Sequence, residues 1–123
     1  MNHDQQLWRL ETQFWLAGAD FYERTLCADA WMVFPPPAGV LDRAATLESV
    51  RGARWRTVSI DARHLEMPDS NVAVLAYVAR AERGEAESAY VAQCSSTYVL
   101  GADGWRLALH HQTPLGEDGD PRT

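Results

Sequence analysis

The sequence is short of the features that mark several large classes of protein. It has only two cysteines, Cys27 and Cys94, and they lack the Cys-x-x-Cys spacing of a zinc site. Its eleven basic residues form no run and are outnumbered by seventeen acidic ones, for a formal net charge of -6. Nucleic-acid affinity comes largely from clustered Lys and Arg. We therefore expect no metal, no cofactor and no nucleic-acid partner, and we interpret both cysteines as reduced thiols.

Long hydrophobic runs are missing as well. No segment approaches the roughly 20 apolar residues of a membrane helix, and the opening MNHDQQLWRLETQF lacks the apolar stretch of a signal peptide. These absences predict a cytoplasmic protein without membrane association. The composition that remains, 46% hydrophobic and 23% charged, is that of a globular chain of one-domain length. We predict a single domain over residues 1–115 and a flexible polar tail over 116–123.

The spacing of apolar residues predicts helices in the first half. Between residues 4 and 18 one broad face carries Leu7, Trp8, Glu11, Phe14 and Trp15. Asp20 and Glu23 resemble a capping box at the start of a second, short helix. An apolar strand at 31–34 is stopped by three prolines. Asp42 is then placed to cap a third helix.

The second half alternates between polar and apolar residues with the period of strands. Four long strands are expected, with alternation over 58–62 and 72–79 in the first two and bounds of 90–100 and 105–113 for the others, and with an Asp-Gly turn before the last. Long antiparallel strands bend around whatever packs on their concave face. The pattern therefore predicts an α+β fold: a cone-shaped, strongly curved, mainly antiparallel sheet with three helices on its concave side.

Two segments carry a family resemblance: ADFYERTLCADAWMVFPPPAGVLDRAATLESV and YVAQCSSTYVLGADGWRLALHHQTP. With the order of elements, they resemble the nuclear transport factor 2-like superfamily, in its bacterial SnoaL-like and ketosteroid-isomerase-like branch. The likeness covers roughly residues 5–115. It implies a cone-shaped domain with a pocket between the helices and the sheet, and a homodimer formed through the convex sheet face.

The catalytic carboxylate of ketosteroid isomerases is not matched in this chain. The resemblance places that base at the end of the first strand, just before a proline, where this sequence has Phe34, which cannot accept a proton. Asp61 and Arg63 could form part of an epoxide-hydrolase relay, but the polar alternation around them is also typical of a solvated or dimer-facing strand. The sequence thus contains no recognisable catalytic set.

Two adjacent histidines, His110 and His111, stand on the last predicted strand. Neighbouring side chains of a strand point to opposite faces, so only one of them can face the pocket. The family pattern favours His111, as a ligand contact or as a catalytic acid or base. The alternative interpretation is a histidine that is hydrogen-bonded for structural reasons.

Strand parity also predicts the pocket lining. Cys94, Ser96 and Tyr98 share one face of their strand, as Tyr77 does with its neighbours on the strand before. Cys94 has no base or cation close in sequence, so it is interpreted as a small buried side chain rather than a nucleophile. The complete predicted set of ligand-binding residues is Trp15, Phe34, Tyr77, Cys94, Ser96, Tyr98 and His111.

The sequence therefore predicts a small-molecule-binding homodimer with an apolar, aromatic-lined pocket for a small hydrophobic organic ligand. Two alternatives remain open. One is an enzyme of the same fold, an isomerase, dehydratase, cyclase or hydrolase with His111 as acid or base. The other is a non-catalytic dimerisation or protein-interaction module whose hollow is filled.

Overall fold

The computed structural model describes residues 2–84 and 88–115. Three helices and six strands follow one another along the chain. They are α1 (His3–Leu16), α2 (Ala19–Thr25), β1 (Leu26–Val33), β2 (Val40–Leu41), α3 (Arg43–Ser49), β3 (Thr57–Asp69), β4 (Val72–Glu82), β5 (Tyr90–Gly101) and β6 (Gly104–Pro114). The tail predicted at 116–123 lies outside the described residues.

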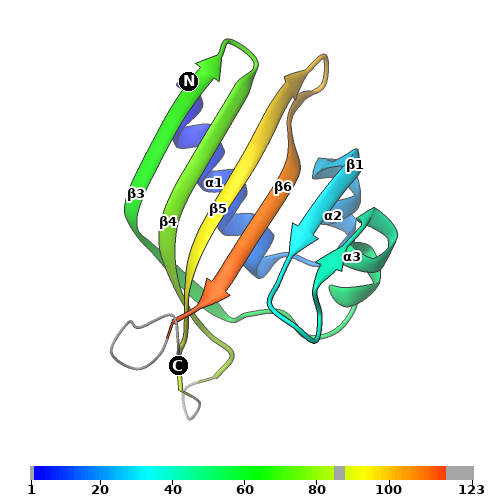
Figure 1. The fold of residues 1–123 in the computed structure, drawn as a ribbon, viewed down its shortest axis with the longest axis vertical. Coiled ribbons are helices and arrows are strands. Elements are labelled where there is room, and N and C mark those ends of the chain that lie inside the picture. Colours follow the sequence, from blue (N-terminus) through cyan, green and yellow to red (C-terminus); the bar gives the residue numbers. More distant parts are fainter. Residues whose placement is uncertain (1, 85–87, 116–123) are drawn as a thin grey trace.

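The strands form one curved, unclosed sheet in the order β2-β1-β6-β5-β4-β3. Every neighbouring pair is antiparallel except β1 and β6, which run parallel. The helices lie on one side of this sheet, with α1 behind the long strands and α2 and α3 beside β1 (Figure 1). The predicted α+β class, with a curved and mainly antiparallel sheet, is confirmed.

Helix α1 covers the concave face of the sheet. Its N-terminus is capped by the Asn2 side chain, which accepts a hydrogen bond from the Gln5 backbone N–H at 2.8 Å. Leu7 and Phe14 on its inner face pack into the main core together with Leu75 of β4 and Tyr98 of β5. These buried apolar side chains are what fix the helix across the strands.

Two details of the predicted helices have different outcomes. The cap of α3 is confirmed, since the Asp42 carboxylate accepts from the Ala45 N–H at 2.9 Å. The capping box at Asp20 is wrong: α2 begins at Ala19 behind Gly18, and no side chain caps it. α1 and α2 are separated by only two residues, so the chain enters α2 before Asp20 can take the cap position.

A bulge in β6 reverses the predicted orientation of the histidines. Thr97 of β5 pairs with Leu109, but the next residue, Tyr98, pairs with Leu107, which leaves Ala108 as the extra residue. Beyond the bulge His110 pairs with Ser96 and is buried. His111 pairs with Ser95 and is exposed, so the prediction that it faces the concave side is wrong.

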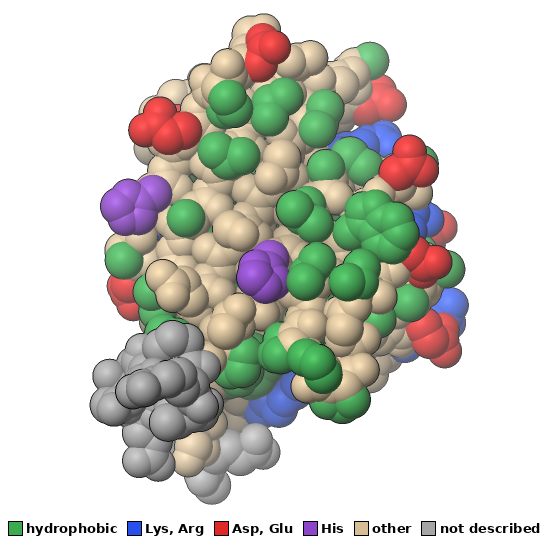
Figure 2. Space-filling model, in the orientation of Figure 1, with side chains coloured by type: hydrophobic (Ala, Val, Ile, Leu, Met, Phe, Trp, Pro, Cys, Tyr) green, Lys and Arg blue, Asp and Glu red, His purple; other side chains and the backbone are tan. Residues whose placement is uncertain are grey.

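The convex face of the sheet is poor in charge. Alternate residues of β4 and β5 point to this side, and valines are prominent among them. Figure 2 views this face and shows hydrophobic side chains and a histidine over its centre, with the acidic groups nearer the rim. Large apolar side chains left exposed on the sheet include Trp31, Val74, Val99 and Leu109.

Candidate functional site

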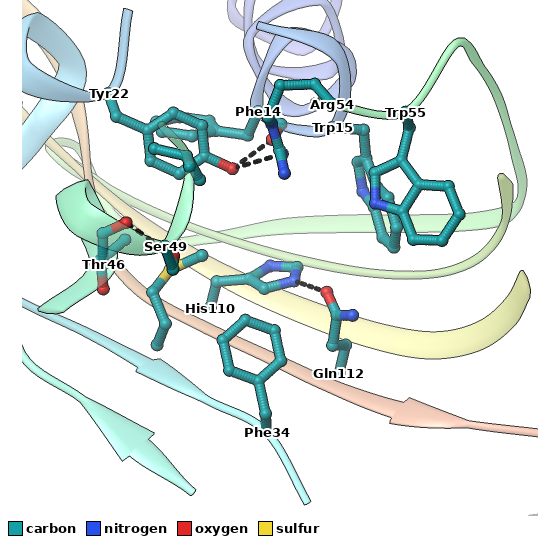
Figure 3. A pocket seen from close by; sticks show the side chains of 12 residues that line it. Phe14, Trp15, Tyr22, Phe34, Thr46, Ser49, Arg54, Trp55, His110 and Gln112 are labelled. Carbon is teal, nitrogen blue, oxygen red and sulfur yellow. Dashed lines mark hydrogen bonds between the residues drawn. The ribbon is translucent and has the colours of Figure 1, made fainter. Parts of the chain in front are cut away.

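A cavity of about 80 Å³ opens where the helices meet the concave face of the sheet near β1 and β6. Every helix contributes to its wall, as do β1, β6 and the loop from α3 to β3 (Figure 3). Its lining residues are Phe14, Trp15, Tyr22, Met32, Phe34, Thr46, Ser49, Val50, Arg54, Trp55, His110 and Gln112. Apolar walls with a few convergent polar groups are typical of small-molecule sites.

Larger hollows elsewhere are weaker candidates. One of about 460 Å³ lies beside the ends of α2 and β6. Glu23, Arg24, Asp103 and Arg106 around it are all exposed. A hollow lined by solvated charges of both signs is a surface groove, and it lacks the enclosing aromatic wall of the smaller cavity.

Aromatic rings hold one another in place around the cavity. The Trp15 and Trp55 ring centroids lie 6.1 Å apart, and Trp55 stacks on Tyr90 at 5.3 Å with an interplanar angle of 21°. On its other side Trp55 contacts Arg83, whose guanidinium carbon lies 4.1 Å from the ring centroid. The loop residue Trp55 is therefore fixed by three partners, which gives the pocket a preformed wall.

Arg54 supplies a cationic group to the pocket. Its Nε donates to the Ala17 carbonyl at 2.8 Å. Its Nη2 donates to the Phe14 carbonyl at 2.8 Å and to the Tyr22 hydroxyl at 3.0 Å. These bonds also satisfy carbonyls at the end of α1, where helical partners run out. The guanidinium thus ties the loop to the helix and is held across the cavity from His110 (Figure 3).

A buried carboxylate lies behind the pocket wall. Glu11 of α1 is fully buried, a position that costs several kcal/mol unless the charge is paired and hydrogen-bonded. Its Oε1 accepts from the Tyr98 hydroxyl at 2.7 Å, and its Oε2 accepts from the Ser96 hydroxyl at 2.7 Å and from the Tyr77 hydroxyl. His110 Nδ1 lies 3.4 Å from the same Oε2. Four side chains from three strands therefore converge on this one residue.

The hydrogens of this cluster can be assigned by counting. Ser96 has one hydroxyl hydrogen and donates it to Glu11, although its oxygen also lies 2.7 Å from His110 Nδ1. That second contact then needs a hydrogen on Nδ1, which donates to the Ser96 oxygen. His110 Nε2 lies 2.9 Å from the Gln112 Oε1, and the Gln112 amide in turn donates to the Tyr90 hydroxyl at 2.9 Å. A continuous hydrogen-bonded chain thus runs from Glu11 to the pocket wall.

The pKa values in the cluster shift in two directions: that of Glu11 is lowered, and those of Tyr77 and Tyr98 are raised. Burial alone would raise the pKa of Glu11, but the hydrogen bond and charge of His110 and the hydroxyls of Tyr77 and Tyr98 outweigh it, so the pKa is lowered. Burial, followed by the Glu11 charge, raises the pKa values of Tyr77 and Tyr98 well above 10. The carboxylate therefore stays ionised while the phenols around it stay protonated donors.

The predicted ligand-binding residues fall into three groups. Trp15 and Phe34 line the cavity. Tyr77, Cys94, Ser96 and Tyr98 lie on the concave face as predicted, but they are buried beneath α1 and do not line the cavity. His111 lies on the opposite face, and its neighbour His110 occupies the position predicted for it.

Several functional candidates were missed by the sequence reasoning. Glu11 had a signal, because a glutamate on an otherwise apolar helix face must be buried with partners. Arg54 was counted only among the scattered basic residues, whereas it is half-buried in the pocket wall. Trp55 and Gln112 carry no periodic signal, since one lies in a loop and the other follows the bulge.

The described residues contain neither a metal-ligand cluster nor a membrane-spanning helix. No group of three or more His, Cys, Asp or Glu side chains within residues 2–84 and 88–115 could hold a metal ion. No helix in this part of the chain is long and apolar enough to cross a membrane.

Several solved structures share this arrangement of helices on a curved sheet. A ketosteroid isomerase candidate from Parabacteroides distasonis ATCC 8503 superposes with a TM-score of 0.78 at 11% identity, over 94% of this chain and 90% of that one. A nuclear transport factor 2-like protein of unknown function in nutrient uptake, from Rhodospirillum rubrum ATCC 11170, gives 0.76 at 16% identity, over 94% and 100%. The association domain of C. elegans CaMKII gives 0.69 at 15% identity, over 88% and 89%.

The chain therefore has the nuclear transport factor 2-like fold, as its sequence predicted. At these identities the likeness defines the fold alone. No protein-family model matches the sequence, and no curated protein sequence does so either.

Proposed function

We propose that this chain is a small-molecule-binding domain whose ligand occupies the aromatic cavity beside His110. The observation that carries the proposal is the preformed wall: Trp15, Trp55 and Phe34 surround the space, while Arg54, His110 and Gln112 direct polar groups toward it. Such convergence of a few polar groups in an apolar cavity is characteristic of ligand sites. Of the residues predicted from the sequence, Trp15 and Phe34 are kept as proposed contacts, and His110 replaces His111.

A fragment screen tests this proposal. Small neutral and charged compounds should raise the melting temperature, and Val50→Phe, which adds a ring to the cavity wall, should abolish the effect. Val40→Phe, at an exposed valine outside the cavity wall, is the matched control and should keep it. If no fragment stabilises the wild-type protein, or if Val50→Phe responds as the wild type does, the proposed binding site is wrong.

We also propose that the protein is a cytoplasmic homodimer that associates through the convex face of the sheet. Trp31, Val74, Val99 and Leu109 expose between 36% and 49% of their surfaces there, and apolar patches of this kind often mark interaction sites. The similarity to an association domain supports self-assembly as part of the function. The branch of the superfamily is proposed to be the SnoaL-like one, on the sequence segments quoted above.

The cluster behind the pocket favours one second candidate, an acid–base enzyme of the same fold. Glu11 and Ser96 orient the His110 ring from behind, as the third member of a catalytic triad orients a histidine. The phenyl ring of Phe34 excludes the ketosteroid-type base at its position. For a ligand found in the screen, His110→Gln should then abolish its chemical conversion while binding persists. Conversion that survives in His110→Gln, or absence of any conversion, would contradict the enzyme candidate.

A further inference from the structure

Arg54 supplies a positive charge to the proposed ligand pocket. Among the described residues, the pocket wall includes this guanidinium and no aspartate or glutamate, although the chain as a whole has a net charge of -6. We propose that the pocket binds a small organic carboxylate, with the anionic group on Arg54 and a short aliphatic part against the tryptophans. This inference rests on the proposed small-molecule function and names the class of ligand.

Arg54 is fixed in place by neutral groups. Within the part of the chain that the structure describes, its hydrogen bonds are accepted by two backbone carbonyls and the Tyr22 hydroxyl. Burial raises the pKa of Tyr22 to about 12, so this partner remains a neutral phenol. Among the described residues no carboxylate forms an ion pair with Arg54, and its Nη1 donates no hydrogen bond. Figure 3 shows the Arg54 side chain at the cavity. A carboxylate is the partner that a guanidinium fork fits best.

The buried carboxylate of this region is already engaged. Glu11 accepts from three hydroxyl groups and pairs with His110, so it is not available to neutralise Arg54. The wall opposite Arg54 adds the Gln112 amide, which donates one N–H to Tyr90 and retains a second, while both ring nitrogens of His110 are engaged by Ser96 and Gln112. These donors on two sides suit an acceptor-rich anionic group between them.

The volume of the cavity limits the size of the ligand. Its volume of about 80 Å³ is small beside the roughly 300–1,000 Å³ of pockets that hold drug-sized ligands. We therefore expect a ligand of few non-hydrogen atoms, such as a carboxylate with a short aliphatic chain. So few atoms limit the affinity to roughly the micromolar to millimolar range.

The indole N–H signals in a nitrogen-15 NMR spectrum provide the test. Five tryptophans are present. Trp15 and Trp55 line the pocket, whereas Trp8, Trp31 and Trp105 do not. Sodium butyrate should shift the first two signals in a saturable way and leave the other three in place. Butyramide has the same shape without the charge and should bind at least about tenfold more weakly; sodium chloride at equal ionic strength should cause no shift.

Two arginine variants complete the experiment. Arg54→Met should abolish the butyrate response. Arg51→Met, which removes an exposed arginine of the same loop, should preserve it. Equal binding of butyramide, or an undiminished response in Arg54→Met, overturns the inference. If Arg54→Met fails to fold, because two carbonyls lose their donor, the comparison of butyrate with butyramide on the wild type decides alone. When neutral fragments shift the pocket indoles and butyrate does not, the carboxylate inference fails while the proposed binding function stands.

Discussion

At the scale of single residues, the burial of the Glu11 carboxylate carries a large desolvation penalty. A carboxylate that is fully buried is tolerated only because hydroxyl groups and His110 compensate for its lost hydration. Its removal should therefore cost more stability than the loss of an apolar neighbour of similar size. The same network makes stability depend on pH.

For Glu11→Gln we expect a loss of about 3–5 kcal/mol in the free energy of unfolding at pH 7, since His110 and the hydroxyl donors lose their anionic partner. The folded-state pKa of Glu11 is lowered, so its contribution is present above the ordinary glutamate pKa and is lost as the pH falls through the folded value. Urea titrations from pH 7 to pH 3 should show a steeper decline for the wild type than for Glu11→Gln. Parallel curves would mean that Glu11 is not the group that titrates.

The two cysteines should differ in reactivity. Burial, then the Glu11 charge, raises the pKa of Cys94 to about 12, and this thiol is only 4% exposed. Burial also raises the pKa of Cys27, but its side chain is partly exposed and Arg106 opposes the shift. With Ellman's reagent at pH 8, Cys94 should react more than about tenfold more slowly than Cys27, because it must wait for local opening. Cys27→Ser should remove the fast phase; if the fast phase remains, Cys94 is accessible.

At the scale of elements, the bulge in β6 decides which histidine enters the interior. His110→Ala should lower the free energy of unfolding by about 1–3 kcal/mol, because Ser96 and Glu11 lose a buried partner. His64→Ala on the exposed side of β3 is the control and should change it by less than about 0.5 kcal/mol. Thermal melts of the two variants measure the difference. Equal melting temperatures would contradict the register described for β6.

The elements also show how far the sequence alone could lead. Alternation predicted the four long strands, and the spacing of Leu7, Phe14 and Trp15 predicted α1, because these patterns are local. The bulge at Ala108 leaves no trace in the alternation, so His110 and His111 were assigned to the wrong faces. The loop that carries Arg54 and Trp55 has no period at all, and its path depends on contacts with α1 and Tyr90 that are distant in sequence. For this reason the fold was predictable, whereas only Trp15 and Phe34 of the twelve residues that line the cavity were predicted.

At the scale of the whole molecule, the convex face leads to a prediction about mass. Light scattering at micromolar concentration should give about twice 13.8 kDa. Leu109→Arg places a charge in the apolar part of this face and should give a folded monomer. Ala102→Arg in the exposed β5–β6 turn is the control and should remain dimeric. A wild-type monomer, or a Leu109→Arg dimer, would show that the face is not the interface.

The open sheet also has a consequence for the behaviour of the protein in concentrated solution. An unclosed sheet has two free edges, and free edges can recruit further strands and start fibrils. Here one edge strand, β2, is only two residues long. The other, β3, is interrupted by two register shifts, has Ala62 in the left-handed region at φ 51°, and carries Asp61, Arg63 and Glu66. Neither edge offers a long, flat and uncharged strand as a template. Edge-to-edge association of sheets into fibrils is therefore disfavoured, although the sheet is not closed.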